Sequence, residues 1–453
     1  MPATKIVERF LTAAGLTRPE LRAWALYDWA NSAVVLTIVT ALFPIYYATV
    51  ASAGTSAPMA TVHFARTTSL ALAVIAITGP VLGAIADVTG RRKHFLGAFL
   101  ALGVLGVGGM FFITAGQWIL ASVLFGITTV GLNGSFVFYD ALLPHVARDD
   151  EIDRVSTAGY ALGYLGSGLL MAVQLAWILR PGWFGFPSGQ SLTPAERTLP
   201  VRIAFVTVAI WWAVFSIPLF RRVPEPPATR ARSSRARRNA IRTALHGLRT
   251  TLSHLRGYRS AFLMLLAFLI YNDGIGTIIR MASLYGQQLG IGSGALIGAI
   301  LLVQFVGIPF AFLFGRLARR IGAKRSIFVG LAMYVLISVV GYFMRTATHF
   351  FILAFLVGTV QGGTQALSRS LFASMIPRAD SGEFFGFFAV CDKFAGIFGP
   401  LLYGETVLHT GSSRSGILSV IAFFLVGAAV LAFVDVDAGQ AAVAVDAAPP
   451  VSV

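Results

Sequence analysis

The stretch Gly83-Ala-Ile-Ala-Asp-Val-Thr-Gly-Arg-Arg-Lys93 joins two hydrophobic runs and ends in three consecutive cations. A weaker copy, Gly315-Arg-Leu-Ala-Arg-Arg-Ile-Gly-Ala-Lys-Arg325, begins 232 residues later, again between two hydrophobic runs. A second landmark repeats at nearly the same offset, because Pro144 and Pro377 each follow a hydrophobic run and lie 233 residues apart. The same offset of 233 aligns two glycine pairs, Gly163 with Gly396 and Gly166 with Gly399. Two independent landmarks at one offset indicate a duplicated unit built as a parallel repeat.

The composition places the chain in a membrane. Of its 453 residues, 56% are hydrophobic and 12% are charged, and the mean hydropathy is +0.77. A soluble domain has about 25% charged residues, so this chain has too few charges to solvate its surface. Its hydrophobic runs have about the 20 residues that a helix needs to cross a bilayer. We predict an all-α integral membrane protein with about twelve transmembrane helices in two pseudo-symmetric six-helix bundles. The predicted spans are 25–50, 66–86, 95–115, 118–142, 157–179, 201–220, 260–286, 293–314, 326–344, 349–371, 384–405 and 415–434.

The positive charges predict which side of the membrane each connection faces. When the N-terminus is placed in the cytoplasm, 27 of the 35 Lys and Arg residues fall on the cytoplasmic side and 6 on the outer side. This bias follows the positive-inside rule. We therefore expect both termini in the cytoplasm and the protein in a bacterial plasma membrane.

One long polar connection, residues 221–259, divides the predicted spans into two sets of six and contains eleven arginines. These charges either bind anionic lipid headgroups, each contributing about 1 kcal/mol, or form a solvated linker that fixes the topology. The predicted domains, in chain order, are a cytoplasmic N-terminal segment, a six-helix bundle, a basic linker, a second six-helix bundle and a disordered cytoplasmic tail. Their bounds are 1–24, 25–220, 221–259, 260–434 and 435–453.

The sequence indicates neither a metal site nor a cofactor. The seven histidines are scattered and Cys391 is the single cysteine, so neither a metal cluster nor an internal disulfide is expected. The net charge of +16 does not predict nucleic-acid binding, because the cations lie in short segments between hydrophobic runs. The phosphate-binding pattern G-x-x-x-x-G-K-[ST] is missing and the sequence contains no hydrolase constellation, so we expect a protein that is not an enzyme. Its energy would come from a gradient, or any transport would be passive. Asp273 or Asp392, if buried, would serve proton coupling.

The stretch Gly83–Lys93 resembles the signature loop of the major facilitator superfamily, G-x-x-x-D-(R)-x-G-R-(R/K)-(R/K), between its second and third helices. The matching positions are Gly83, Asp87, Gly90, Arg91 and Arg92. Val88 stands where the superfamily usually has a basic residue, and Arg319 replaces the aspartate in the second copy. The resemblance implies that Asp87 acts in gating, by pairing with one of the following arginines while the cytoplasmic side is closed.

Four further segments resemble the branch of this superfamily that includes the fungal vacuolar amino-acid effluxer of autophagy and its bacterial relatives. They are Trp24-Ala-Leu-Tyr-Asp-Trp-Ala-Asn31, Tyr271-Asn-Asp-Gly274, Gln361-Gly-Gly-Thr-Gln-Ala-Leu-Ser-Arg-Ser370 and Glu383-Phe-Phe-Gly-Phe-Phe388. The resemblance implies twelve helices around a cavity and transport of a small molecule, with amino acids as the substrate class.

Charged and polar residues inside the predicted spans are the candidates for substrate binding or coupling, because each charge costs about 2.5–3.5 kcal/mol to insert. They are Asp28, Asn31, Asp140, Asp273, Arg280, Gln361, Gln365, Asp392 and Lys393. Asp28 and Asn31 share one face of the first span, although Asp28 also fits a carboxylate stabilised by the helix dipole at the membrane boundary. Asp392 and Lys393 are about 100° apart around their helix, so only one of them faces a cavity.

Asp273 and Arg280 form the central hypothesis. Gly274 and Gly276 follow Asp273, so we expect a weakened or unwound turn whose backbone groups face a cavity. Seven residues separate Asp273 from Arg280 by about 10 Å along the helix axis, which is too far for a direct pair. The two charges would therefore bind substrate or couple transport, or else form salt bridges with neighbouring helices.

The residues are compatible with three functions. The first is a secondary transporter of a small polar solute such as an amino acid, whose charges an aspartate and Arg280 or Lys393 would bind. The second is a multidrug-type efflux antiporter, although Tyr164 replaces the proline of the G-x-x-x-G-P pattern usual in the fifth span. The third is a non-transporting membrane receptor or scaffold. We expect a monomer.

Overall fold

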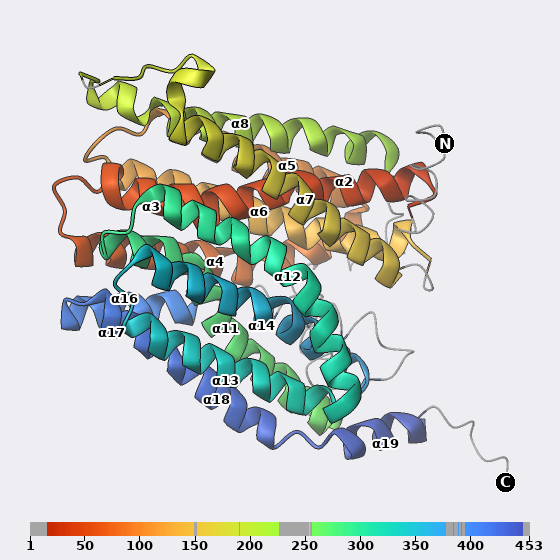
Figure 1. Ribbon diagram of the computed structural model, residues 1–453. Coiled ribbons are helices and arrows are strands. Elements are labelled where there is room, and N and C mark those ends of the chain that lie inside the picture. The colour runs from red at the N-terminus through yellow and green to blue at the C-terminus, as the bar shows by residue number, and fades with distance from the viewer. Residues whose placement is uncertain are drawn as a thin grey trace, which may run out of the picture. The chain divides into compact units, whose positions relative to one another are not determined.

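All regular structure in the described part of the chain is helical. The computed structural model describes residues 16–148, 152–189, 191–225, 253, 256–376, 384, 388, 391 and 395–446. By its contacts the chain divides into two compact units, Met1–Ser56 with Ile77–Ala240 and Ala57–Ala76 with Ile241–Val453. One long helix, α4 (Ala57–Thr89), therefore belongs to the second unit in its first part and to the first unit in its second part (Figure 1).

The remaining helices each belong to one unit. Those of the first unit are α2 (Pro19–Val34), η1 (Val35–Ala41), α3 (Leu42–Tyr46), η2 (Tyr47–Ala51), α5 (Arg92–Gly109), η3 (Met110–Phe112), α6 (Trp118–Val146), α7 (Ile152–Leu179), η4 (Pro181–Phe184) and α8 (Pro194–Arg222). Those of the second unit are α11 (Arg259–Gln288), α12 (Ser293–Ile321), α13 (Ala323–Tyr342), α14 (Ala347–Ala373), α16 (Phe398–Thr410), α17 (Ser413–Ser419), α18 (Ile421–Ala432) and α19 (Val436–Asp446).

Ten helical segments in the described residues are long and apolar enough to cross a membrane. They coincide with ten of the twelve predicted spans. The predicted span 293–314 lies on α12, where the apolar helix Ser293–Gly307 is shorter. The predicted span 384–405 includes the start of α16, a helix of 13 residues, and its earlier part lies mostly outside the described residues. The helix count fits the predicted twelve.

The first span is a continuous helical run, Pro19–Ala51, that changes its winding on both sides of Pro44. Pro44 lacks an N–H and would crowd the carbonyl one turn earlier in a regular α-helix. The wider π turns of η1 precede it, and Leu42 donates its N–H to the carbonyl of Thr37, five residues back. The Thr40 hydroxyl donates to the carbonyl of Val35 at 3.0 Å, so the altered turn keeps its polar groups bonded.

The two units repeat the same helix pairings. In the first unit α2 packs against α7 and α8, and α5 packs against α6 and α8. In the second unit α11 packs against α16 and α18, and α13 packs against α14 and α18. In span order, both units therefore pair the first helix with the fifth and sixth, and the third helix with the fourth and sixth. This agreement supports the duplication that the sequence predicts.

A lysine from each copy of the signature stretch fastens the third helix of a unit to its sixth. Lys93 at the start of α5 donates from Nζ to the carbonyls of Phe220 (2.8 Å) and Val223 (2.6 Å) at the end of α8. Lys324 at the start of α13 donates to the carbonyls of Ala432 (3.0 Å), the last residue of α18, and Val434 (2.7 Å). A cation is favourable at these helix ends because the last carbonyls lack partners within the helix.

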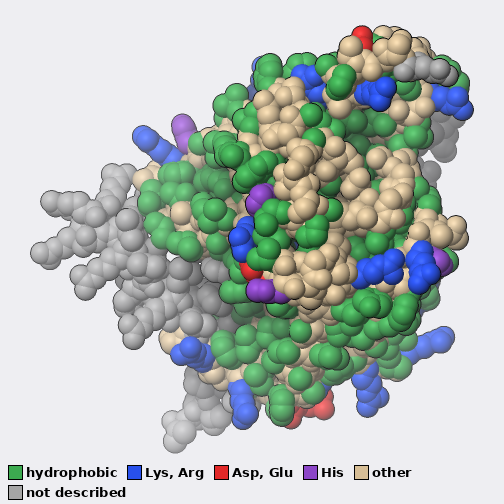
Figure 2. All heavy atoms as spheres, turned by 90° about the vertical axis from the view of Figure 1, so that its left-hand side faces the viewer, with side chains coloured by type: hydrophobic (Ala, Val, Ile, Leu, Met, Phe, Trp, Pro, Cys, Tyr) green, Lys and Arg blue, Asp and Glu red, His purple; other side chains and the backbone are tan. Residues whose placement is uncertain are grey.

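Large hydrophobic side chains lie exposed along the helices, as expected for a surface in contact with lipid. Leu105, Phe305 and Phe433 are 73%, 67% and 74% exposed. A soluble monomer rarely exposes many large apolar side chains along its helices. Figure 2 looks onto the ends of the helices, where Lys and Arg side chains stand singly or in small groups among hydrophobic and polar ones.

Candidate functional site

The centre of the candidate site is Asp273, a carboxylate in the middle of α11 that is only 2% exposed. It accepts two backbone hydrogen bonds from the first turn of α16, from Phe398 N–H to Oδ2 (3.0 Å) and from Gly399 N–H to Oδ1 (2.8 Å). These N–H groups have no partner within their own helix, and the helix dipole favours a negative charge beside them. Asp273 therefore binds the N-terminus of α16 as an anion would.

The break in the helical path lies in the predicted eleventh span and not beside Asp273, so the predicted unwound turn of the seventh span is wrong. Helix α11 continues through Gly274 and Gly276. The chain before α16 instead forms a turn, where Gly396 has a φ of 104°, a value that favours glycine. The glycines of α11 serve close packing, because a methyl group at Gly274 would lie 2.9 Å from the ring of Phe424.

Arg280 reaches the same place from two turns further along α11. Its guanidinium lies against Gly276, one turn earlier, and a methyl group at Gly396 would lie 2.5 Å from its Nη1. The two opposite charges of Asp273 and Arg280 also attract each other electrostatically. The axial distance of about 10 Å did not allow for the length of an arginine side chain, which folds back along the helix. Both charges therefore border the interruption at Gly396.

The residues that precede Asp273 tie α11 to α14. Tyr271 and Ser368 share a hydrogen bond of 2.5 Å, and Gln365 Nε2 donates to Asn272 Oδ1 at 3.1 Å. Asp273 then binds α16, so three consecutive residues of α11 hold two neighbouring helices. Gln365, a predicted site residue, thus contacts Asn272, the residue before Asp273, and Gln361 lies one turn before Gln365 on α14, partly buried.

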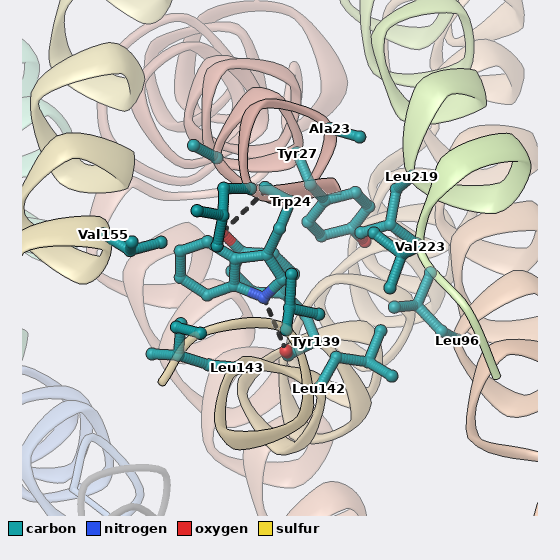
Figure 3. Close-up of a cluster of buried hydrophobic side chains, with 14 of the residues drawn as sticks. Ala23, Trp24, Tyr27, Leu96, Tyr139, Leu142, Leu143, Val155, Leu219 and Val223 are labelled. Carbon is teal, nitrogen blue, oxygen red and sulfur yellow. Dashed lines mark hydrogen bonds between the residues drawn. The ribbon is translucent and has the colours of Figure 1, made fainter. Parts of the chain in front are cut away.

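In the first unit, Asp28 occupies a comparable position on α2 and is 7% exposed. Tyr139 of α6 donates its hydroxyl to Asp28 Oδ2 at 2.9 Å. The Tyr139 ring stacks on Trp24 at 4.5 Å, and the Trp24 indole N–H donates to the backbone carbonyl of Tyr139 at 3.2 Å (Figure 3). Asp28 is therefore a buried carboxylate with a phenol partner. It lies beyond the first turn of α2, so the alternative of a carboxylate stabilised by the helix dipole does not hold.

Both units place an aspartate, a hydroxyl one turn later and a close glycine together. In the first unit a methyl group at Gly159 would lie 2.5 Å from Asp28 Oδ2, and one at Gly163 would overlap Ser32 Oγ. In the second unit a methyl group at Gly399 would overlap Thr277 Oγ1 and lie 2.6 Å from Asp273 Oδ1. The first and fifth helices of each unit thus approach closely where the carboxylate lies.

Asn31, three residues after Asp28, is fully buried. Its Nδ2 has no hydrogen-bond partner among the described residues, and its Oδ1 accepts a long bond of 3.5 Å from Ser32 Oγ. A buried donor without a partner costs about 1–3 kcal/mol, and a polar ligand could supply the missing bond. The role of Asn31 as a contact for a polar ligand stays a prediction.

The other predicted residues differ in what the structure shows. Asp140 is exposed, and its neighbour Tyr139 supplies the group that binds Asp28. Asp392 and Lys393 lie outside the described residues, as does the side chain of Asp87.

In the signature stretch, Gly90 ends α4 with a φ of 64°, which explains the glycine. The Arg91 N–H donates to the carbonyl of Ala86 at 3.1 Å, so the chain turns tightly into α5 after Gly90. Arg92 contacts the His145 ring at the end of α6. Gly83 lies within α4. The structure thus shows how the stretch connects α4 to α5, and the gating role of Asp87 stays a prediction.

The sequence did not reveal a polar contact between the first part of α4 and two helices of the second unit. Arg66 donates from both Nε (2.9 Å) and Nη2 (2.6 Å) to Glu405 Oε1 on α16. Gln288 at the end of α11 donates to the carbonyl of Ala57 at 2.8 Å and contacts Thr61. These residues lie near span ends, where charged side chains are common, so their pairing leaves no pattern in the sequence.

The profile of the family described as Vacuole effluxer Atg22 like matches residues 16–444. The chain belongs to this family. A relative from Bacillus subtilis (strain 168), named an uncharacterized MFS-type transporter YxiO, is 38% identical over 91% of this chain and 94% of its own. Autophagy-related protein 22-1 of Phaeosphaeria nodorum is 26% identical over 83% of this chain and 76% of its own. This member of the vacuole effluxer family is therefore a transporter of the MFS type.

Solved structures show the same fold. A bacterial homologue of the human lysosomal transporter Spinster, in an inward-facing and occupied conformation, matches with a TM-score of 0.65 and 12% identity, over 95% of this chain and 98% of its own. A D-xylose–proton symporter matches with a TM-score of 0.65 and 16% identity, over 93% and 98%. At these identities the likeness concerns the fold alone. The predicted all-α membrane fold of the major facilitator type is confirmed for this effluxer-family protein.

Proposed function

We propose that this protein is a secondary transporter that moves amino acids across the membrane by alternating access. The observation that carries the proposal is the meeting of Asp273 and Arg280 at the interrupted span of the second unit. Charges inside a membrane are costly and mark substrate or ion pathways. Interrupted transmembrane helices place unpaired backbone groups at substrate sites in other transporters. The family description, which names an effluxer, agrees with the export of a solute.

In this proposal Arg280 binds the carboxylate of the amino acid. A guanidinium presents paired N–H donors that match the two oxygens of a carboxylate. Arg280 is partly buried, and it lies beside Gly396, where the chain turns before α16. A substrate carboxylate at this position would also lie near the start of α16, where the helix dipole favours a negative charge.

Asp273 is the proposed proton-coupling group. As a carboxylate it accepts bonds from the N–H groups of both Phe398 and Gly399. A bound proton would turn one oxygen into a donor and remove the charge that the helix N-terminus stabilises. Protonation would thereby loosen the joint between α11 and α16, and deprotonation would restore it. A proton gradient would drive the transport cycle through this joint.

The experiment is transport of labelled amino acids into reconstituted vesicles, with and without an imposed pH gradient. Arg280→Ala should raise the apparent dissociation constant of the substrate by about tenfold or more, because a charge-assisted bidentate contact is lost. Arg280→Lys should recover part of the affinity, and Arg345→Ala, at an exposed arginine, should leave it unchanged. Uptake of hydrophobic cations instead of amino acids would show the multidrug alternative. No transport of either class would favour a receptor or scaffold.

The contact between Arg66 and Glu405 is the proposed latch on the outer side. The two side chains are 52% and 35% exposed, so their pair contributes about 1 kcal/mol or less and is easily broken in a cycle. A methyl group at Gly404 would lie 2.9 Å from the Ala65 Cβ, so α4 and α16 touch beside the pair. Opening of the outer side would separate α4 from α16 at this latch.

We expect Arg66→Glu to weaken the latch about two- to fivefold, because it replaces an attraction by a repulsion. The measurement is the labelling rate of Ala65→Cys, a buried position, by a membrane-impermeant maleimide in a Cys391→Ser background. The rate should rise in Arg66→Glu and fall again when Glu405→Arg restores the opposite charges. Ala53→Cys in the exposed loop before α4 should label quickly in every variant. Equal labelling rates of Ala65→Cys with the unchanged pair, with Arg66→Glu and with the charge-reversed double variant would contradict the proposed latch.

The same proposal places both termini in the cytoplasm and the protein in a bacterial plasma membrane. Its support is the strong excess of Lys and Arg on one side of the spans. It also keeps the predicted domain bounds, with the linker 221–259 between two bundles.

A further inference from the structure

A pocket of about 320 Å³ lies in the first unit, between the start of α2 and the end of α8. Three arginines border it, Arg22 from α2 and Arg221 and Arg222 from the last turn of α8. Its remaining walls include the apolar side chains of Leu26 and Ile217. The pocket therefore combines a cluster of guanidinium groups with an apolar surface.

The arginines bring an excess of positive charge to this pocket. Among the described residues, no carboxylate lies within ion-pair distance of any of the three guanidiniums. Arg22 is held in place by its own bonds, from Nε to the carbonyl of Leu16 (2.8 Å) and from Nη2 to that of Thr17 (3.0 Å). Cations at the end of α8 suit the helix dipole, but Arg22 lies near the start of α2, where the dipole disfavours a positive charge. The helix dipole therefore does not explain why Arg22 lies beside the other two arginines.

A phosphate group is the anion that such a cluster fits. Guanidinium groups bind phosphate oxygens through paired, charge-assisted hydrogen bonds. The pocket lies where a membrane span ends and the basic linker begins. Its apolar walls, next to the arginines, suit contact with a hydrocarbon chain. Ile217 is 43% exposed, so the apolar wall continues onto the surface that faces lipid. Charge and apolar wall together fit a molecule that carries both a phosphate and an acyl chain.

The second unit contains a matched pocket that lacks this charge. It has about 390 Å³ and lies between the start of α11 and the end of α18, the corresponding helices of the repeat. Its charged residues are Arg259 and Asp435, one of each sign, and α19 contributes Ala438 and Ala442 to its wall. The duplicated position therefore has balanced charge in one unit and three cations in the other.

We propose that the pocket of Arg22, Arg221 and Arg222 binds the phosphate headgroup of an anionic phospholipid, with an acyl chain along Leu26 and Ile217. In the proposed orientation the pocket faces the cytoplasmic leaflet, which carries the anionic lipids that attract basic segments. The lipid would join the first and sixth helices of this unit by a shared ligand. This site is separate from Asp273 and Arg280, and its existence does not depend on the transported substrate.

The test is native mass spectrometry of the full chain in detergent, with dioleoyl phosphatidylglycerol and dioleoyl phosphatidylcholine as probes. The double variant Arg221→Gln with Arg222→Gln should bind phosphatidylglycerol about tenfold more weakly, and the matching double Lys variant should retain most of the binding. Arg259→Gln in the matched pocket should bind as the unchanged protein does. Thermal unfolding in detergent should show that each variant is folded.

Two further arms separate this pocket from other sources of binding. A variant with the linker residues Arg230, Arg232, Arg235, Arg237 and Arg238 changed to Gln should keep the tight phosphatidylglycerol site. Loss of that site in the linker variant, with binding intact in the double Gln variant, would overturn the assignment to the pocket. Equal binding of phosphatidylcholine and phosphatidylglycerol would overturn the anionic headgroup. Displacement of the lipid by an equal concentration of inorganic phosphate would show a free-phosphate site and overturn the lipid.

Discussion

Asp273→Asn is expected to reduce gradient-driven transport by about tenfold or more. The asparagine keeps the size of the side chain but turns one acceptor oxygen into an NH₂ donor. One of the two N–H groups at the start of α16, on Phe398 or Gly399, then faces a donor. A hydrogen bond to a charged group contributes about 1.5–3 kcal/mol, and 1.4 kcal/mol corresponds to a factor of ten. The variant also cannot exchange a proton, so the proposed coupling is lost.

The measurement compares net uptake driven by a pH gradient with exchange of labelled for unlabelled substrate in the same vesicles. If Asp273 couples protons, exchange should persist in Asp273→Asn while net uptake is lost. Asp435→Asn is a matched control, because Asp435 also binds a helix N-terminus, through Oδ1 to the Ala438 N–H at 3.0 Å, but is exposed. It should transport normally. Normal net uptake by Asp273→Asn would show that Asp273 is only a structural cap of α16. Loss of both net uptake and exchange would show that the contact between Asp273 and α16 is needed for every step of transport and not for proton coupling alone.

The sequence predicted a break in α11, but the structure has its break just before α16. Gly274 and Gly276 after a buried aspartate suggested a weak turn, since glycine lowers helix stability by about 1 kcal/mol. In α11 the surrounding packing overrides this propensity, because Gly274 accommodates the ring of Phe424 and Gly276 the guanidinium of Arg280. The real break had its own signal, since Pro400 lies in the first turn of α16, where a proline is tolerated and marks a helix start.

The all-α membrane fold, the repeated helix pairings and the burial of Asp273 agree with the sequence prediction, because they depend on features that the chain itself displays. Span length, hydropathy and the spacing of repeated landmarks are properties of the chain itself. The partners of the buried carboxylates are not, since Tyr139 is 111 residues from Asp28 and Gly399 is 126 residues from Asp273. Asp140 was a plausible candidate because it is a charged residue in a predicted span. Neighbours on a helix point about 100° apart, so Tyr139 reaches Asp28 while Asp140 is exposed.

Gly399→Ala is expected to destabilise the protein by about 1–3 kcal/mol and to impair transport. A methyl group at this position would overlap Thr277 Oγ1 and lie 2.6 Å from Asp273 Oδ1 and 2.9 Å from the Asp273 backbone carbonyl. The hydroxyl of Thr277 is fixed by its bond to that carbonyl at 2.8 Å, so it has little freedom to move aside. The start of α16 would have to withdraw from α11, which would lengthen both hydrogen bonds to Asp273.

Thermal unfolding in detergent and vesicle transport test this together, with Gly168→Ala as the matched control. Gly168 is also a glycine inside a helix, but a methyl group there would meet nothing within 4 Å. Alanine at that position should be neutral or stabilising by about 1 kcal/mol, from helix propensity alone. Adding Thr277→Ala to Gly399→Ala should recover part of the lost stability, because it removes one of the overlapping atoms and leaves the backbone contact. If Gly399→Ala unfolded at the same temperature as Gly168→Ala, α16 would not rest on Asp273 as described, and the joint proposed for proton coupling would have no structural basis.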